Sequence, residues 1–404
     1  MLRLAGPVVL AELGWMAMGI VDTMMVGRVS AAAIGGVGIG SALFYTAVVF
    51  GAGLLLGLDT LVSQSFGAGD VDDCHRSLLN GVYLTLPLAP LLMVLLWLSV
   101  SLLPAFQVRP EVVGQAGPYL YAITWSVFPQ LLFFALRRYL QGMNQVRVVT
   151  FAVVTANLVN GCANWVLIFG HWGFPAMGAA GAGWATCASR AYMAAMLLGY
   201  ILYYDHRHNT GWRRLAWRPD PGRIGELFRL GLPAALQMTG EVGVFAAAAT
   251  LIGRLDKDSL AAHQIALNMA ALSFMVPLGI SAAAAVRVGQ ALGRRDPAGA
   301  GRAGWTALLL GAGFMSLAGL TFWLVPERIV GAFTQDRAVI ERGAPLLFVA
   351  ALFQLFDGLQ VVATGALRGA GDTRTPMFTH LFAYWAVGLP LGYLLCFRLG
   401  RGAT

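Results

Sequence analysis

The sequence has few charged residues and few cysteines. Only 11% of its 404 residues are Asp, Glu, Lys or Arg, whereas 58% are hydrophobic, and the mean hydropathy is +0.70. Such a chain has too little polar surface to cover a soluble particle of this size. The four cysteines form no CxxC pair, so neither a disulfide framework nor a zinc site is indicated. The composition therefore predicts an all-α polytopic membrane protein without a cofactor.

Motifs of hydrolytic enzymes are also missing. The chain has no HExxH and no GxSxG sequence, and the carboxylates in its apolar segments have no accompanying histidine or cysteine cluster. This disfavours an intramembrane enzyme that acts on lipid or peptide. The net charge of +8 comes from arginines that lie mostly between apolar runs, where membrane orientation explains them. We therefore expect neither catalysis nor a nucleic-acid partner.

What the sequence does have is long apolar runs. A span needs roughly 20 mostly apolar residues, because backbone groups in lipid must be hydrogen-bonded within a helix. Eleven segments meet this requirement. They cover residues 4–26, 38–63, 78–103, 115–140, 148–169, 178–204, 227–252, 263–286, 303–325, 343–367 and 375–398.

The first part of the chain recurs in the second. Residues 3–70 align without a gap with residues 229–296 at an offset of 226, which pairs Pro7 with Pro233 and Gln64 with Gln290. The offset contains six predicted spans, and an even number preserves orientation. The sequence thus predicts two parallel six-helix bundles, as in many secondary transporters. We assign residues 1–205 to an N-terminal lobe, 206–226 to a cytoplasmic linker and 227–404 to a C-terminal lobe.

The C-terminal lobe has five predicted spans where the repeat requires six. The later part of each lobe aligns at an offset of 227, which pairs Gly142 with Gly369 and Arg147 with Arg374. The sixth helix of the first lobe begins near residue 178, so its counterpart would begin near position 405. We therefore expect a twelfth helix after Thr404.

The distribution of positive charge predicts the orientation. If the N-terminus is cytoplasmic, the segments on the cytoplasmic side hold 17 Arg and Lys residues, against nine on the outside. Cytoplasmic loops of membrane proteins carry the excess of positive residues, so this orientation is favoured. Arg190 lies within a predicted span, where we expect it to snorkel or to pack.

Five acidic residues lie inside the predicted spans: Glu12, Asp22, Asp59, Glu241 and Asp357. Each costs roughly 2.5 to 3.5 kcal/mol at mid-helix, so each needs a partner or a water-filled cavity. None recurs at the aligned position of the other lobe. We interpret Glu241, Asp357 and Asp22 as functional. For Glu12 and Asp59 a role in the cavity and a solvated role stay open, because water can reach them near the cytoplasmic surface.

Neutral polar residues accompany the acids of the C-terminal lobe. Gln354 and Gln360 lie three residues before and after Asp357, followed by Thr364, and Gln237 lies one turn before Glu241. These spacings place the side chains on one helix face, which is expected to face the bundle interior. The three glutamines are therefore candidates to line a substrate cavity.

Further residues have a structural as well as a functional interpretation. A second polar stripe comprises Asn157, Asn160 and Asn164. Interhelical hydrogen bonding is the favoured interpretation of this stripe, although it is also a candidate for the cavity. Phe274 is a candidate for an adaptable apolar wall, but such residues more often pack in a core. We expect His263 and His380 to be packing histidines rather than proton carriers.

Four separated motifs carry a resemblance to a known family. They are GIVDTMMVGR around Asp22, AAHQIALN from Ala261, LPAALQMTGEVGVFA around Glu241 and FDGLQVVATGALRGAGD from Phe356. Together they resemble the multidrug and toxic compound extrusion (MATE) family, in particular its bacterial NorM-like branch, over essentially the whole chain. The resemblance implies a V-shaped pair of six-helix lobes in the bacterial inner membrane. It also implies a monomeric antiporter that exports cationic, lipophilic drugs in exchange for Na⁺ or H⁺.

The same resemblance implies a cation site at Glu241 and Asp357 and a role for Asp22 in the other lobe. Na⁺ prefers several oxygen ligands, and the NorM-like motifs favour Na⁺ at this site, with Gln354 as a further ligand. Phe353 departs from the pattern, because NorM-like relatives place a tyrosine there. The missing oxygen leaves a second alternative open, in which a desolvated carboxylate carries H⁺ in place of Na⁺.

A lipid-linked saccharide flippase of the same superfamily is the alternative function. Its cavity would need cationic residues for the pyrophosphate, whereas the intramembrane charges here are mostly acidic. The sequence therefore favours a drug antiporter.

Overall fold

The computed structural model describes residues 1–103, 110–212, 217–252 and 257–398. The expected twelfth helix falls outside these described residues. Within them every regular element is a helix. The first half contains α1 (Leu2–Val26), α2 (Ala31–Leu54), α3 (Gly57–Ala68), α4 (Val71–Leu102), α5 (Pro110–Thr124), α6 (Val127–Gly142), α7 (Val146–Phe169) and α8 (Ala179–His208). The second half contains α9 (Pro221–Ile252), α10 (Lys257–Gly293), α11 (Pro297–Leu324), α12 (Pro326–Gly331), α13 (Arg337–Ala370), α14 (Arg374–Leu381), η3 (Phe382–Gly388), α15 (Leu389–Tyr393) and η4 (Leu394–Arg398).

The predicted number of spans is confirmed among the described residues. Ten helical stretches are long and apolar enough to cross a membrane, and α5 with α6, bent by 48°, make an eleventh. The predicted span 38–63 is a longer stretch, residues 31–68, which comprises α2 and α3. The chain is therefore an all-α polytopic membrane protein.

The helices that flank the predicted linker extend into it. α8 continues to His208 and ends at Asn209, whose positive φ of 49° suits an asparagine C-cap. α9 begins at Pro221, earlier than predicted, because Asp220 accepts hydrogen bonds from the backbone N–H groups of Gly222 and Arg223. A capping aspartate followed by proline is a strong helix start. The connection between the halves is therefore shorter than predicted.

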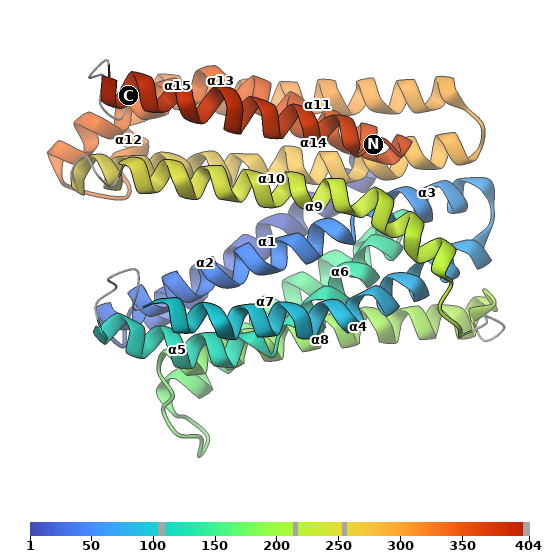
Figure 1. Ribbon diagram of the computed structural model, residues 1–404, viewed down its shortest axis with the longest axis horizontal. Coiled ribbons are helices and arrows are strands. Elements are labelled where there is room, and N and C mark those ends of the chain that lie inside the picture. The colour runs from blue at the N-terminus through green and yellow to red at the C-terminus, as the bar shows by residue number, and fades with distance from the viewer. Residues whose placement is uncertain (104–109, 213–216, 253–256, 399–404) are drawn as a thin grey trace.

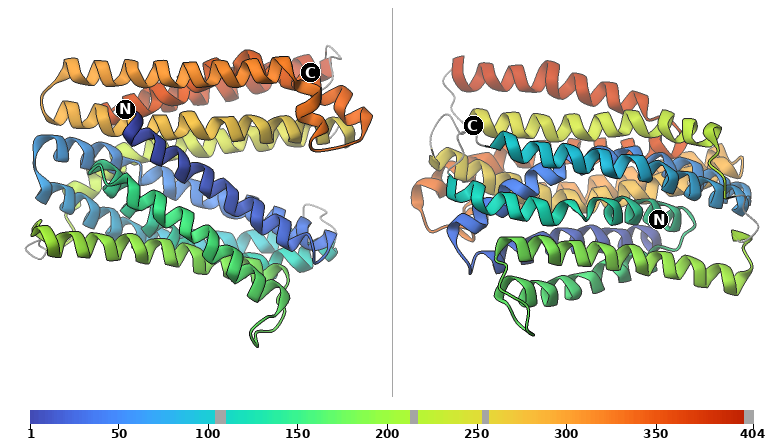
Figure 2. Two further views of the ribbon diagram at one scale, coloured as in Figure 1. Left: turned by 180° about the vertical axis from the view of Figure 1, so that it is seen from behind. Right: turned by 60° about the horizontal axis from the view of Figure 1, so that its bottom comes forward.

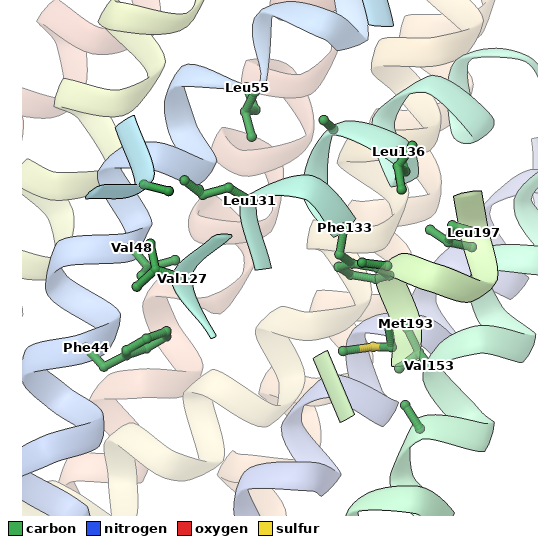
Figure 3. Packing of buried hydrophobic residues seen from close by; sticks show 14 of the residues in the cluster. Phe44, Val48, Leu55, Val127, Leu131, Phe133, Leu136, Val153, Met193 and Leu197 are labelled. Atoms are coloured by element: carbon green, nitrogen blue, oxygen red, sulfur yellow. The ribbon is translucent and has the colours of Figure 1, made fainter. Parts of the chain in front are cut away.

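The two halves form two bundles that lie one above the other in Figure 1. The first half has a large apolar core in which α6 is central, and Figure 3 shows Phe133 and Leu131 of α6 among residues of α2, α7 and α8. The bundles meet at the end of the molecule that carries α3 and diverge toward the end that carries α5 and α12, which the left view of Figure 2 also shows. We call these the α3 end and the α12 end.

Glycines allow the bundles to touch at the α3 end. A Cβ on Gly67 would lie 2.2 Å from the carbonyl oxygen of Gln290, and a Cβ on Gly293 would lie 2.0 Å from that of Gln64. Both distances are shorter than any real contact, so only glycine permits this approach. The two contacts are equivalent in the sequence repeat, which shows that the repeat is present in the packing.

Hydrogen bonds reinforce the same end. Gln64 of α3 donates to the carbonyl oxygen of Gly369 over 3.0 Å, and Gln290 of α10 donates to that of Gly142 over 2.8 Å. Gly369 and Gly142 lie at the C-terminal ends of α13 and α6, where backbone carbonyls lack helical partners. Each half thus caps a helix of the other half.

Candidate functional site

Two carboxylates of the second half are near enough for the charge of one to act on the other. Glu241 is on α9 and Asp357 is on α13, and both are half-buried. The charge of Asp357 acts on Glu241, and both charges act on Tyr384 of η3. Among the described residues, neither carboxylate has an ion pair or a hydrogen bond. An intramembrane carboxylate without a partner is costly, which marks this pair as a candidate functional site.

Neutral polar side chains gather one turn away, around His380 of α14. The amide N–H groups of Gln237 and Gln360 lie 3.2 and 3.3 Å from Nδ1 of His380. Thr364 of α13 lies 3.4 Å from Nε2, and Gln360 also donates to the Tyr384 hydroxyl over 3.0 Å. The predicted residues Gln237 and Gln360 are therefore in one cluster, and sequence analysis missed His380 and Tyr384 as its other members.

Two predicted cavity residues of the second half lie elsewhere. Gln354 is fully buried, and its amide donates to the hydroxyl of Ser273 on α10 over 2.7 Å. This hydrogen bond directs the amide toward α10 rather than toward the His380 cluster. Phe274 follows Ser273 on α10 and is half-buried.

The first half has its own buried polar cluster, around Asp22 of α1. Asn164 of α7 donates to one carboxylate oxygen over 2.6 Å, and Thr186 of α8 donates to the other over 2.8 Å. Asn160 accepts a hydrogen bond from Asn164 over 3.1 Å. The predicted residues Asp22, Asn160 and Asn164 thus come together, and Thr186 joins them.

Asn157 does not belong to this cluster. Its amide donates to the backbone carbonyl of Gly14 over 2.9 Å and so ties α7 to α1. This is the interhelical hydrogen bond that the sequence favoured. Arg190 is buried with its guanidinium 4.3 Å from the ring centre of Phe44, and it donates to Ser126 over 2.6 Å. The packed interpretation of Arg190 is confirmed.

The structure pairs Glu12 and Asp59 with buried arginines. Glu12 forms an ion pair with Arg137 of α6. Asp59 of α3 lies 3.4 Å from Arg138 of α6 and 3.1 Å from Arg368 of α13. The ion pair between Asp59 and Arg368 joins the two halves at the α3 end. The proposed solvated role is wrong for both, since only 9% of Glu12 and 1% of Asp59 is exposed. The two arginines inside the predicted span 115–140 were the signal for these partners.

The electrostatic contrast defines the site. The carboxylates of Glu12 and Asp59 are neutralised by arginine, and that of Asp22 is held by neutral donors. Among the acids well inside the described membrane spans, only the Glu241–Asp357 pair combines two carboxylates with no cationic partner. The described part of the chain also holds no group of three or more His, Cys, Asp and Glu side chains placed to bind a metal ion. The pair can therefore accept a monovalent cation, a proton or a cationic organic molecule.

Comparisons with known proteins agree with this fold. The MatE family model matches the chain twice, over residues 7–166 and 233–394. The chain is 39% identical to a probable multidrug resistance protein NorM of Mesorhizobium japonicum, over 99% of this chain and 87% of the relative. It is 38% identical to the multidrug resistance protein PmpM of Pseudomonas aeruginosa, over 98% of this chain and 83% of the relative.

A solved structure is also similar. The eukaryotic MATE transporter AtDTX14 superposes with a TM-score of 0.90, at 21% identity, over 100% of this chain and 89% of that chain. Identity this low supports the fold, and the bacterial relatives support the family.

Proposed function

The chain belongs to the MatE family, and we propose on this premise that it is an antiporter that exports cationic, lipophilic compounds across the bacterial inner membrane in exchange for a coupling cation. The relatives named as multidrug resistance proteins support the substrate class. The observation that carries the proposal is the Glu241–Asp357 pair, which has no cationic partner among the described residues. The polar cluster beside this pair comprises Gln237, Gln360, Thr364, His380 and Tyr384. Because all five residues lie in one chain, we propose that a monomer suffices for transport.

Competition for the pair couples the two fluxes. A desolvated carboxylate is stabilised by a bound cation, and the charged drug and the coupling cation both supply that charge. When the drug leaves the carboxylates, the coupling cation can bind, and the reverse also holds. Export of the drug is therefore coupled to import of the cation.

We propose H⁺ rather than Na⁺ as the coupling ion. Na⁺ needs several oxygen ligands, but Phe353 supplies none, and the hydrogen bond from the Gln354 amide N–H to Ser273 holds that side chain toward α10. The remaining carboxylates can each carry a proton without further ligands. This choice reverses the sequence-based preference for Na⁺, and the experiment below tests both ions.

Alternating access follows from the contacts between the halves. With the N-terminus in the cytoplasm, the closed α3 end faces the cytoplasm and the α12 end faces outward. Rocking of one bundle against the other would break the Gln64 and Gln290 hydrogen bonds and the Asp59–Arg368 ion pair. The described conformation is then the one that releases drug to the outside and admits protons.

Proteoliposomes test the proposal. A cationic dye such as ethidium is loaded under a pH gradient at fixed Na⁺, and separately under a Na⁺ gradient at fixed pH. The pH gradient alone should drive transport, and Glu241→Gln and Asp357→Asn should each abolish it, whereas Glu341→Gln, at an exposed carboxylate, should not. Transport driven only by Na⁺ would refute the proton proposal, and full activity of either isostere would refute the site.

A further inference from the structure

His380 is placed differently from the other well-buried histidine of the described chain. His75 of α4 contacts the Tyr139 hydroxyl over 2.7 Å and the Thr210 carbonyl over 3.1 Å, which satisfies one acceptor and one donor at the end of the bundle. His380, 7% exposed, contacts side chains of two other helices at both ring nitrogens, in the helical layer just beyond the carboxylate pair. A histidine that only packs, such as His75, does not need to lie beside the carboxylate pair.

The two ring nitrogens of His380 have different neighbours. The Gln237 and Gln360 amides both lie within 3.3 Å of Nδ1, and the Gln237 amide also lies 3.5 Å from Nε2. With Nδ1 as the acceptor of the two shorter contacts, the neutral ring has its proton on Nε2. Nε2 contacts Thr364, which lies further toward the α3 end along α13. The imidazole therefore has one nitrogen toward the glutamines adjacent to the carboxylates and the other toward the α3 end.

A polar path continues from Thr364. Gln237, Thr364, Arg368, Asp372 and Thr373 line a small cavity with room for about one water molecule. At its mouth, the backbone N–H groups of Thr375 and Arg374 donate to the Asp372 carboxylate and lower its pKa, so that it stays ionised. An ionised group at the mouth attracts protons that arrive at or leave from the surface.

The distance between the carboxylates and this surface requires an intermediate carrier. Asp357 and Arg368 are 11 residues apart on one helix, which corresponds to about 16 Å. A proton moves only between groups at hydrogen-bond distance, about 2.6 to 3.2 Å apart, or through one water. His380 contacts Gln237 and Gln360, one turn from the carboxylates, and Thr364, which lines the cavity.

We propose that His380 carries the coupling proton between the Glu241–Asp357 pair and the cytoplasmic surface at the α3 end. The inference rests on the proposed proton coupling. A carboxyl proton passes to Nδ1, directly or through a water molecule, as the Gln237 and Gln360 amides turn to present their oxygens. The Nε2 proton leaves toward Thr364 and the cavity, so the ring stays neutral and changes tautomer. The carboxylate regains its negative charge and can bind drug.

The groups that would influence this titration are known. Glu241 on α9 and Asp357 on α13 lie one turn from the glutamines that contact the ring, and Arg368 on α13 lies one turn from Thr364. Tyr384 of η3 packs edge-on against the imidazole, with ring centres 5.7 Å apart. The charged groups at the start of α14 are Asp372 and Arg374, both near the surface.

Three transport measurements test the role of His380. In proteoliposomes, His380→Gln should lose dye uptake driven by a pH gradient by at least about tenfold, the lower range for losing a positioned proton carrier. The same variant should keep dye binding and dye-for-dye exchange without a gradient, because exchange requires no proton release. His263→Gln, a half-buried histidine of α10 in the same half, should match wild type in all three.

Chemical rescue separates proton transfer from packing. External imidazole should restore gradient-driven uptake to His380→Ala but leave Asp357→Asn inactive. Wild-type uptake by His380→Gln, or loss of dye-for-dye exchange together with failure of rescue, would overturn the inference. Failure of the wild-type protein to respond to a pH gradient would instead overturn the proposed proton coupling.

Discussion

The carboxylates at the α3 end and those in the middle of the second bundle are in opposite environments. At the α3 end, Asp59 is buried between Arg138 and Arg368, and three charged side chains join the two bundles. Further along the second bundle, Glu241 and Asp357 have no cationic partner among the described residues. A buried charge that is neutralised holds a structure together, whereas one that is not neutralised must bind a cation. Partner arginines thus distinguish a structural carboxylate from a transport carboxylate.

Among the substitutions that test this contrast, Asp59→Asn should have the largest effect on stability. The substitution leaves Arg138 and Arg368 buried without their counter-charge, and breaking such a pair costs about 3 to 5 kcal/mol. We expect a large loss of stability in a detergent unfolding titration, while Glu241→Gln, which removes an unpaired charge, should leave stability unchanged or higher. Equal destabilisation by both substitutions would remove the distinction.

Asp22→Asn should have a smaller effect, on transport rather than on stability. Asp22 already accepts hydrogen bonds from Asn164 and Thr186, and an asparagine can accept only one of them without placing its own N–H against the other donor. Dye efflux should fall several-fold, less than for Glu241→Gln. Complete loss of efflux would show that the two halves contribute equally to coupling.

The paired glutamines give a finer test of the contact between the halves. Gln64→Ala removes one hydrogen bond across the α3 end, which is worth about 1 kcal/mol. Gln290→Ala removes the equivalent bond and also a longer one, 3.4 Å, from Asn144. Gln64→Ala should shift the population away from the closed α3 end about fivefold, and Gln290→Ala by at least as much. Distance distributions between spin labels at the exposed positions 76 and 302 would report the shift. A smaller shift for Gln290→Ala than for Gln64→Ala would show that the repeat is not mechanically symmetric.

The smallest expected change comes from Phe353→Tyr. The substitution adds a hydroxyl oxygen one turn before Asp357, on the half-exposed side of α13. Uptake driven by a Na⁺ gradient should appear or strengthen slightly, while uptake driven by a pH gradient persists. No response to Na⁺ would show that ligands beyond this oxygen are lacking.

The fold was largely predictable from the sequence because its signals are local or repeated. Apolar runs of membrane length define the helices, and the aligned glycines and glutamines define the repeat that packs at the α3 end. The start of α9 was missed because a capping Asp220 and a Pro221 within an arginine-rich segment were taken as linker.

The site was only partly predictable because its contacts join residues that are distant in sequence. Arg138 and Asp59 are 79 residues apart, and Gln237 and His380 are 143 residues apart. The polarity of single residues identified the acids and two glutamines correctly as members of polar clusters. Which acids are neutralised, and what surrounds His380, depends on how the helices pack.

The most direct test of the account is whether drug binding displaces a proton. The purified protein in weakly buffered detergent solution is mixed with a cationic dye, and the proton release is followed with a pH indicator. We predict release by the wild-type protein and tighter dye binding as pH rises, because the ionised carboxylates bind the cation. The double variant Glu241→Gln with Asp357→Asn should release none. Dye binding without proton release, or equal release by the double variant, would contradict the central claim that one acidic site alternates between proton and drug.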